Sequence, residues 1–280
     1  MNALLSTMDK LVKESMTNFP SNGEGYTCKH CNSFIPVQVV NFLDQEKIVQ
    51  PACQCEADIL REQQLQREQL VREKETRRLF SISELGERFA DSTFETFQSR
   101  EGSQSAYQVV KKYASEFERW NGDSLGLWGE PGNGKTHLAY AVMNELNNAG
   151  KVVVLQSMPE LLKRIKSTFN NNSRDNEQQI MKALTTCDLL IIDDIGAEKL
   201  TDWVEETIFT IVDGRYRRNK PILYTSNLKP SELADKLGRR SYDRLVEMCL
   251  TVENKATSYR RERATDRIKK FRAEVESWLM

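Results

Sequence analysis

Residues 129–136 read Gly-Glu-Pro-Gly-Asn-Gly-Lys-Thr, which matches the phosphate-binding P-loop pattern G-x-x-x-x-G-K-[ST]. The apolar run at 124–128, Ser-Leu-Gly-Leu-Trp, predicts a short buried strand before the loop. From His137 to Asn148 apolar residues recur at helical spacing, and Gly150 offers a stop. This order of elements directs backbone N–H groups and the positive end of a helix dipole at phosphate oxygens. The stretch therefore predicts a nucleoside triphosphate site.

Within this site, Lys135 is expected to reach the β- and γ-phosphates, and the Thr136 hydroxyl is expected to bind Mg²⁺. The alternative is an incidental glycine turn before a helix, which the flanking strand and helix disfavour. The predicted nucleotide-binding residues are Gly129, Glu130, Pro131, Gly132, Asn133, Gly134, Lys135, Thr136 and His137.

Two later apolar segments end in polar residues. Residues 188–194 read Asp-Leu-Leu-Ile-Ile-Asp-Asp, which is typical of a central parallel strand whose C-terminal end meets a ligand. We expect Asp193 to hold the Mg²⁺ shell and Asp194 to orient or deprotonate the attacking water. Residues 221–227 read Pro-Ile-Leu-Tyr-Thr-Ser-Asn, and Asn227 is a candidate sensor of the γ-phosphate. An Asn after a strand is more often a turn former, so this assignment depends on context.

Four of the six cysteines lie in one short stretch near the N-terminus. Cys28 and Cys31 form a C-x2-C pair, and Cys53 and Cys55 form a C-x-C pair after 21 intervening residues. Thiolates from two such turns can bind one Zn²⁺ tetrahedrally, and the metal would supply folding energy that a segment of this size cannot obtain by burial. His30 could replace one cysteine, and an iron–sulfur cluster or free thiols are the other interpretations.

The composition limits the class of protein. The chain has 280 residues, of which 39% are hydrophobic and 29% charged, with a formal net charge of −1, so any contact with nucleic acid must come from a local patch. No run approaches the roughly 18 apolar residues of a membrane span, and the N-terminus lacks a secretory apolar core, so we expect a cytoplasmic protein with no membrane partner. Residues 56–78 are charged and free of Gly and Pro, which predicts a solvated helical connector.

A basic segment precedes the acidic strand. Residues 158–169 carry Lys163, Arg164 and Lys166 and end at Phe169. Basic side chains beside an aromatic ring can contact the phosphates of single-stranded DNA and stack on its bases. A peripheral helix with solvated basic residues and an inward-packed Phe is the other interpretation, and the sequence leaves both open.

Together these segments resemble the AAA+ ATPases, and within them the DnaC/DnaI-type replicative helicase loaders, with the IstB transposase helpers as close relatives. The resemblance covers about residues 85–262. The stretches that carry it are RFADSTF at 88–94, GEPGNGKT at 129–136, LLIIDDIGAE at 189–198, YTSN at 224–227 and GRRSYDRL at 238–245.

The resemblance implies roles for individual residues. Asn227 would be sensor 1, Arg240 the arginine finger that acts on a neighbouring subunit's nucleotide in a homo-oligomer, and Arg260 sensor 2, while 88–94 would lie near the adenine. Only 53 residues follow Asn227, too few for the helical lid of most AAA+ proteins, and this fits the DnaC-like branch. Most AAA+ members have Glu where this chain has Asp194, and the shorter side chain reaches less far toward water, so we expect slow hydrolysis.

The expected function is ATP-dependent loading of a replicative hexameric DNA helicase onto single-stranded DNA, with ATP, Mg²⁺ and Zn²⁺ as cofactors. The alternatives are an IstB-like transposition helper ATPase and a non-enzymatic zinc adaptor. An N-terminal cysteine module is characteristic of DnaI-like loaders and favours the first, and the intact Lys135, Asp193 and Asn227 disfavour the adaptor.

The expected fold is α/β, with a P-loop AAA+ core whose parallel sheet is flanked by helices and which lacks a full helical lid. A small zinc-binding module and a helical linker precede it. We expect the module at 1–58, where it would dock the helicase, the linker at 59–84 and the ATPase core at 85–280.

Overall fold

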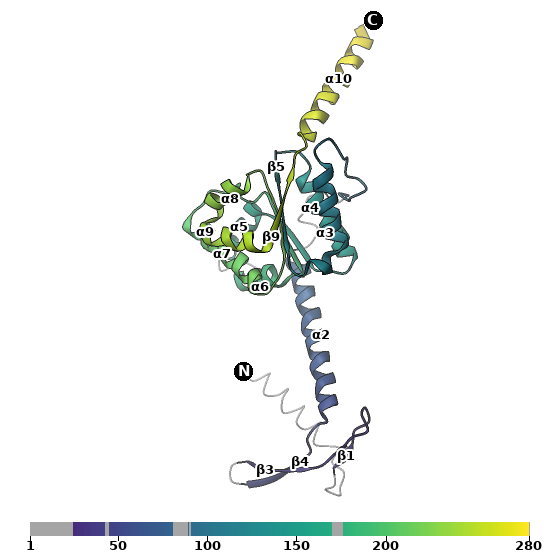
Figure 1. Cartoon of the computed structure of the whole chain (residues 1–280), viewed down its shortest axis with the longest axis vertical. Coiled ribbons are helices and arrows are strands. Elements are labelled where there is room, and N and C mark those ends of the chain that lie inside the picture. The colour runs from purple at the N-terminus through teal and green to yellow at the C-terminus, as the bar shows by residue number, and fades with distance from the viewer. Residues whose placement is uncertain (1–24, 43–44, 81–88, 90, 170–175, 280) are drawn as a thin grey trace. The chain divides into compact units, whose positions relative to one another are not determined.

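The structure is a computed structural model of the chain, and it describes residues 25–42, 45–80, 89, 91–169 and 176–279 (Figure 1). The chain divides into two compact units, one up to Val71 and one from Arg72 onward. The division falls inside the long helix α2 (Gln54–Leu79), whose residues are mostly exposed. The helical connector predicted from the charged run is therefore present.

A five-stranded parallel sheet forms the centre of the larger unit, with the strand order β6-β7-β8-β5-β9. The predicted parallel sheet is confirmed. The strands are β5 (Ser124–Gly129), β6 (Val153–Ser157), β7 (Leu189–Asp193), β8 (Ile222–Ser226) and β9 (Cys249–Asn254).

Helices cover both faces of this sheet (Figure 1). One face carries α3 (Gln104–Ser115) and α4 (Lys135–Asn148). The other carries α5 (Met158–Ser167), α6 (Glu177–Thr186), α7 (Asp202–Tyr216), α8 (Pro230–Leu237) and α9 (Arg239–Met248).

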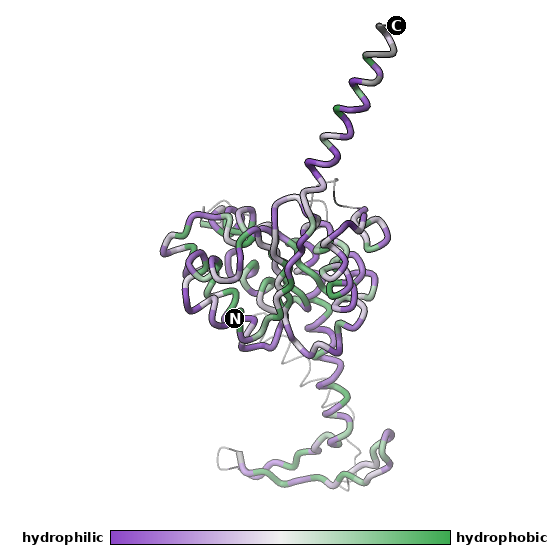
Figure 2. The backbone as a smooth tube through the Cα atoms, turned by 45° about the horizontal axis from the view of Figure 1, so that its top comes forward, coloured by the Kyte–Doolittle hydropathy of each residue, from purple (hydrophilic) through white to green (hydrophobic). Residues whose placement is uncertain are grey.

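The hydrophobic core has two parts, one on each side of the sheet, and β7 contributes to both. Leu189 and Ile191 lie in the cluster under α3 and α4, whereas Leu190 and Ile192 lie in the cluster under α5 to α9. Successive side chains of a strand point to opposite faces, so a strand buried on both sides is apolar throughout. Hydrophobic residues accordingly concentrate in the central strands (Figure 2).

The strand register brings the ends of three strands to one edge of the sheet. Trp128 of β5 lies opposite Ser226 of β8, and Ile192 of β7 lies opposite Tyr224 of β8. Parallel strands end at the same edge, so the loop after β5, the acids that end β7 and the residue after β8 are neighbours. This edge positions the candidate site.

A single helix, α10 (Tyr259–Leu279), follows β9, so the chain forms no helical lid domain within the described residues. Every helix in the described ranges is too short or too polar to cross a lipid bilayer.

The smaller unit contains two antiparallel strand pairs and the start of α2. β1 (Tyr26–Thr27) pairs with β2 (Phe34–Ile35), and β3 (Gln38–Phe42) pairs with β4 (Gln45–Val49). Two-stranded sheets of this length are marginal in water without further support. The cysteine cluster described below lies at the base of these strands, in the same unit.

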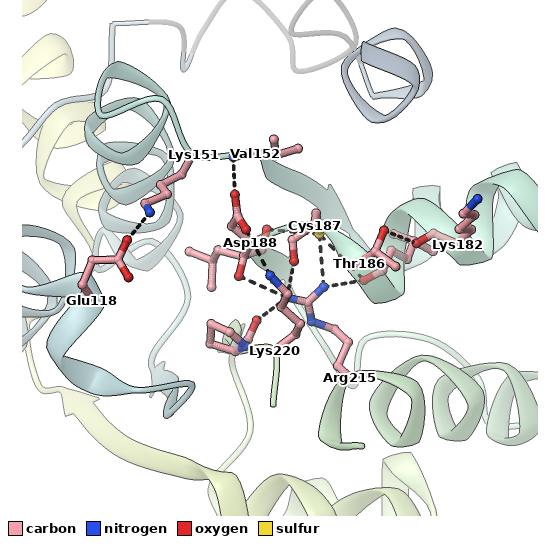
Figure 3. A network of polar contacts seen from close by, with 12 residues as sticks. Glu118, Lys151, Val152, Lys182, Thr186, Cys187, Asp188, Arg215 and Lys220 are labelled. Atoms are coloured by element: carbon pink, nitrogen blue, oxygen red, sulfur yellow. Dashed lines mark hydrogen bonds and ion pairs between the residues drawn. The ribbon is translucent and has the colours of Figure 1, made fainter. Parts of the chain in front are cut away.

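The buried side chain of Arg215 holds the opposite edge of the large sheet together (Figure 3). Its Nη1 donates to the carbonyl of Leu184 at 2.5 Å and to Cys187 Sγ at 3.1 Å. Its Nη2 donates to the carbonyls of Cys187 and Pro221 at 3.1 and 2.7 Å. One guanidinium thus joins the end of α6 to the segments that begin β7 and β8, because it donates to buried carbonyl oxygens of all three.

We expect Arg215→Ala to lower the free energy of unfolding by about 3–5 kcal/mol, because several buried carbonyl oxygens lose a charged donor. Urea denaturation followed by circular dichroism measures this change. Arg217→Ala is the matched control, since Arg217 is exposed and forms a surface ion pair with Asp213 one turn away, so its effect should be small. Equal effects of the two substitutions would contradict the role given to Arg215.

Candidate functional site

The P-loop has the backbone that a phosphate cradle needs. Gly129, Gly132 and Gly134 have φ values of 143°, 81° and 104°, a region that side chains rarely adopt. A Cβ at Gly132 would lie 2.4 Å from Ser258 Oγ, and one at Gly134 would lie 2.9 Å from a ring carbon of Phe97. Helix α4 begins at Lys135, two residues before the predicted helical pattern that starts at His137, so its N-terminus faces the cradle.

Lys135 is buried with its ammonium held over the loop. Nζ donates to the carbonyls of Gly129 and Glu130, both at 2.8 Å, and to Asn227 Oδ1 at 3.0 Å. Burial lowers the pKa of Lys135 to about 8, although the acids at the end of β7 oppose the shift. A bound triphosphate would give this ammonium a negatively charged partner. Lys135 is therefore suited to the phosphate contact predicted for it.

Asp193 and Thr136 form the candidate magnesium site. Thr136 Oγ1 lies 3.1 Å from both carboxylate oxygens of Asp193, and Thr225 Oγ1 donates to Asp193 Oδ1 at 2.6 Å. Burial raises the pKa of Asp193, since it penalises the charged carboxylate. Hydroxyl and carboxylate oxygens are the donors that Mg²⁺ accepts, and a bound cation would offset the cost of that buried charge.

Asp194 and Asn227 connect the acids to the lysine. Asn227 donates through Nδ2 to Asp194 Oδ1 at 3.0 Å and accepts from Lys135 through Oδ1. Asp194 has a φ of 54°, unusual for a residue other than glycine, and its N–H donates to Thr225 Oγ1 at 3.0 Å. Asn227, the predicted sensor, therefore contacts the P-loop lysine and the second acid after β7 at once.

A pocket of about 310 Å³ opens between the P-loop and the aromatic side chains beside it. Arg260, Asp194 and Asn227 line it together with the loop. Its other walls include Phe89, Ser92, Thr96, Phe97, Gln98, Arg100 and Tyr259. Phe89 and Ser92 belong to the segment 88–94 expected near the adenine, of which Arg88 and Ala90 lie outside the described residues. The aromatic walls suit a nucleobase.

His137 packs against this wall. Its ring lies edge-on to Phe97, with 5.4 Å between the ring centroids, and its Nε2 donates to the carbonyl of Thr93 at 2.8 Å. The His137 side chain therefore attaches the segment that contains Thr93 and Phe97 to helix α4. The backbone N–H of His137 lies in the first turn of that helix.

Arg240 lies apart from the pocket. It is exposed on α9, with its guanidinium 4.2 Å from the centroid of the Phe209 ring, and it is not among the residues that line the nucleotide pocket. The structure thus brings the six residues Lys135, Thr136, Asp193, Asp194, Asn227 and Arg260 to one site and leaves Arg240 outside it.

Sequence reasoning missed Arg100 and Thr225. Arg100 donates to the carbonyl of Asn133 in the P-loop at 3.1 Å and to Glu262 of α10 at 3.0 Å. Its partners are distant in sequence, so no local pattern marks it. Thr225 lies in the quoted YTSN stretch, where a hydroxyl near the end of a central strand was the available signal.

On α5, Lys163 and Lys166 are exposed, while Arg164 lies over the ring of Phe80 at 4.8 Å. Phe169 is 51% exposed and contacts Trp203 edge-on, with 6.0 Å between the ring centroids. The helix buries a full apolar face of Met158, Leu161, Leu162 and Ile165. Two lysines and part of one aromatic ring therefore remain accessible to a ligand.

The four N-terminal cysteines converge. Their Sγ atoms all lie within 4.8 Å of one another, and Cys28–Cys55, Cys31–Cys53 and Cys53–Cys55 are each 3.4 Å apart with no disulfide. A tetrahedral Zn²⁺ with bonds of about 2.3 Å places its sulfur atoms roughly 3.8 Å apart. The donor set fits zinc, and His30 offers only its backbone N–H, to Cys28 Sγ at 3.4 Å.

The fold and the site define a P-loop ATP-binding protein of the AAA+ class. The IstB-like ATP binding protein family matches residues 49–267. The replicative helicase loader DnaC of Escherichia coli K12 is 33% identical over 195 residues, which cover 69% of this chain and 78% of that protein. A solved DnaC helicase loader gives a TM-score of 0.55 at 24% identity and covers 61% of this chain and 100% of its own. A solved DnaI gives a TM-score of 0.52 at 22% identity, and the match covers 62% of this chain and 93% of that chain.

This chain therefore belongs to the IstB-like ATP binding family, together with the DnaC replicative helicase loaders. The resemblance inferred from the motifs is confirmed.

Zinc binding is tested by metal analysis of the full chain purified without chelator. We expect about one Zn²⁺ per chain, lost on substitution of Cys28 or Cys53 by Ser and retained in Cys249→Ser, because only the first two belong to the sulfur cluster. Hydrogen exchange of residues 25–56 should rise when the metal is removed. A metal-free protein whose exchange in this segment is already slow would contradict the assignment.

ATP binding should take up protons above neutral pH. The Lys135 pKa of about 8 would rise when phosphate contacts the ammonium, so the bound state holds more protons and the affinity falls as the pH rises above about 8. Calorimetry at about pH 8.5 in two buffers of different ionisation enthalpy measures the uptake. It should vanish at lower pH, where Lys135 is already charged. Buffer-independent heats at the higher pH would refute the shift.

Proposed function

We propose that this chain is an ATP-dependent loader that places a replicative hexameric DNA helicase on single-stranded DNA in the cytoplasm. The observation that carries the proposal is one connected set of hydrogen bonds, from Lys135 through Asn227 to Asp194, in a chain of the DnaC family. A degenerate P-loop would not retain this set, so the geometry speaks against a non-enzymatic adaptor.

Within this proposal, ATP hydrolysis is slow. Asp194 orients the attacking water, and Arg260, which lines the pocket beside the P-loop, senses the nucleotide. The short Asp194 side chain is already engaged by Asn227, so water activation requires that this hydrogen bond be shared or broken. ATP then acts mainly as a switch of assembly state.

Arg240 acts on the nucleotide of a neighbouring subunit. Its exposure on α9, outside its own subunit's pocket, supports a role across an interface between copies. The flanking Arg244 also lies over Phe209, with 4.8 Å from guanidinium to ring, and pairs with Asp213 at 2.7 Å. The Arg240 guanidinium stacks on this ring too, while the residue as a whole stays exposed, and a role for it across an interface implies a head-to-tail homo-oligomer.

The zinc module docks the helicase. Phe34, Val39 and Ile48 are 59%, 62% and 66% exposed, and Val39 lies directly opposite Ile48 on the β3–β4 pair. Exposed apolar pairs on a short two-stranded sheet favour burial against a partner. The helicase is the partner that the family relationship suggests.

The α5 segment engages single-stranded DNA. Lys163 and Lys166 are exposed one turn apart and suit two phosphates, and the half-exposed ring of Phe169 suits a base. Arg164 contributes less, since its guanidinium is stacked on Phe80. Lys163→Glu with Lys166→Glu would therefore lower DNA affinity and flatten its salt dependence, in contrast to Lys111→Glu with Lys112→Glu on α3.

The function is tested by helicase loading onto circular single-stranded DNA coated with single-strand binding protein, read out as displacement of an annealed oligonucleotide. The chain with ATP should stimulate the helicase of its own host, while Lys135→Ala and Arg240→Ala should each fail. A mixture of the two variants should recover part of the activity, because an intact finger from the first then meets an intact P-loop in the second.

Arg217→Ala is the control, as an exposed arginine outside both sites. Undiminished loading by Lys135→Ala would refute the nucleotide switch, and failure of the mixture would put Arg240 in its own subunit's site. A chain that leaves the helicase off the DNA yet stimulates strand transfer by a transposase would favour the IstB-like alternative, to which the matched family gives its name.

A further inference from the structure

Helix α10 carries an apolar stripe that nothing in the described chain covers. Ile268, Phe271 and Trp278 are 52%, 65% and 81% exposed, and Val275 lies between the last two. Their spacings of three, four and three residues place them at the a and d positions of a heptad repeat. Figure 2 shows α10 as a mostly hydrophilic helix interrupted by short hydrophobic stretches. Such a seam is typical of a helix that pairs with another helix.

The charges beside the seam decide which helix fits it. With Ile268 at position a, Arg267 and Glu274 occupy g positions and Arg272 an e position. In a parallel pair of identical helices, g faces e of the other chain, which would set Arg267 against Arg272 twice. In an antiparallel pair, g faces g, and Arg267 meets Glu274 at both ends. The helix is complementary to itself in the antiparallel direction only.

We propose that α10 pairs antiparallel with α10 of a second copy of this chain. In this pair Ile268 packs against Phe271 of the second copy, and Ala264 packs against Val275. Two ion pairs, Arg267 with Glu274 in each direction, flank these layers. The contact is isologous, so it closes at two copies. It is separate from the head-to-tail interface of Arg240, and it does not rest on helicase loading.

The first turn of α10 is fastened to the nucleotide loop. The N–H of Tyr259 donates to the carbonyl of Gly132 at 2.9 Å. Arg100 donates to the carbonyl of Asn133 and to Glu262, and its guanidinium lies 5.2 Å from the Tyr259 ring centroid. The pairing helix therefore starts at the P-loop itself, so a pair of α10 helices would hold two nucleotide sites in a fixed relation.

A polyanion is the ligand that would compete with a second copy of the chain for helix α10. Between Arg260 and Arg272 the helix carries seven basic and two acidic residues, and a broad cavity beside Arg100 is lined by several of them. A phosphate backbone would be attracted to that half of the helix but would leave the apolar seam exposed and would gain nothing from Glu274. The second copy accounts together for Ile268, Phe271, Val275 and the g-position charges, which a polyanion does not.

The experiment is sedimentation of the full chain with charge reversals. Arg267→Glu and Glu274→Arg should each weaken self-association at least about tenfold, since each turns both ion pairs into repulsions. Mixed in equal amounts, the two variants should associate as well as the parent, because a heterodimer restores both attractions. Phe271→Glu should dissociate the pair with no rescue by mixing, and Lys270→Glu, a reversal outside the seam, should leave association unchanged.

Helicity measured by circular dichroism confirms that each variant folds. A parent that stays monomeric at its highest soluble concentration would overturn the proposal. It would also be overturned if the mixed variants stayed apart, or if Lys270→Glu weakened association as much as Arg267→Glu. DNA affinity that falls with both Arg267→Glu and Lys270→Glu and is not recovered by mixing would assign the helix to a polyanion instead.

Discussion

The buried ammonium of Lys135 is the interaction on which the rest of the site depends. It lies at the edge of the sheet where β5, β7 and β8 end, and its protons go to the carbonyls of the P-loop and to Asn227. A buried cation is costly unless it is paired and hydrogen-bonded, so the neighbouring acids and acceptors are needed for the fold as well as for the ligand. Because these carbonyls bind Lys135, they also help to hold the loop, whose glycines have the positive φ values needed to cradle phosphate.

The sequence predicts this edge well because its signals are local. A loop motif, an apolar run with terminal acids and a strand with a terminal Asn each lie within eight residues, and the parallel topology brings their ends together. Arg100 and Arg215 could not be predicted in this way, and Thr225 offered only the weak signal of a hydroxyl near the end of a strand. Each acts on backbone or side chains from distant segments, and an arginine or threonine has the same local appearance whether it is solvated or serves such contacts.

In the cysteine cluster, too, the sequence predicts the ligand residues but not the contacts that support them. Spacing alone predicts that two pairs of thiols meet, and the structure brings all four together. The support around them is not visible in the spacing. Tyr26 donates its hydroxyl proton to Glu56 at 2.8 Å and accepts the N–H of Cys53 at 2.8 Å, which ties the first strand of the unit to the start of α2. A tyrosine two residues before a cysteine carries no pattern that would identify this contact.

The C-terminal part of the chain is coupled to the nucleotide loop by side-chain contacts at the end of β9. Asn133 and Asn254 exchange hydrogen bonds, side chain to carbonyl in each direction, at 2.7 and 3.0 Å, and both residues are buried. A reciprocal pair of this kind is lost as a unit, because displacing either residue breaks both hydrogen bonds. Any rearrangement of the P-loop on phosphate binding must therefore move the end of β9 with it. The segment that leads into α10 begins one residue later, so the orientation of that helix follows the state of the loop.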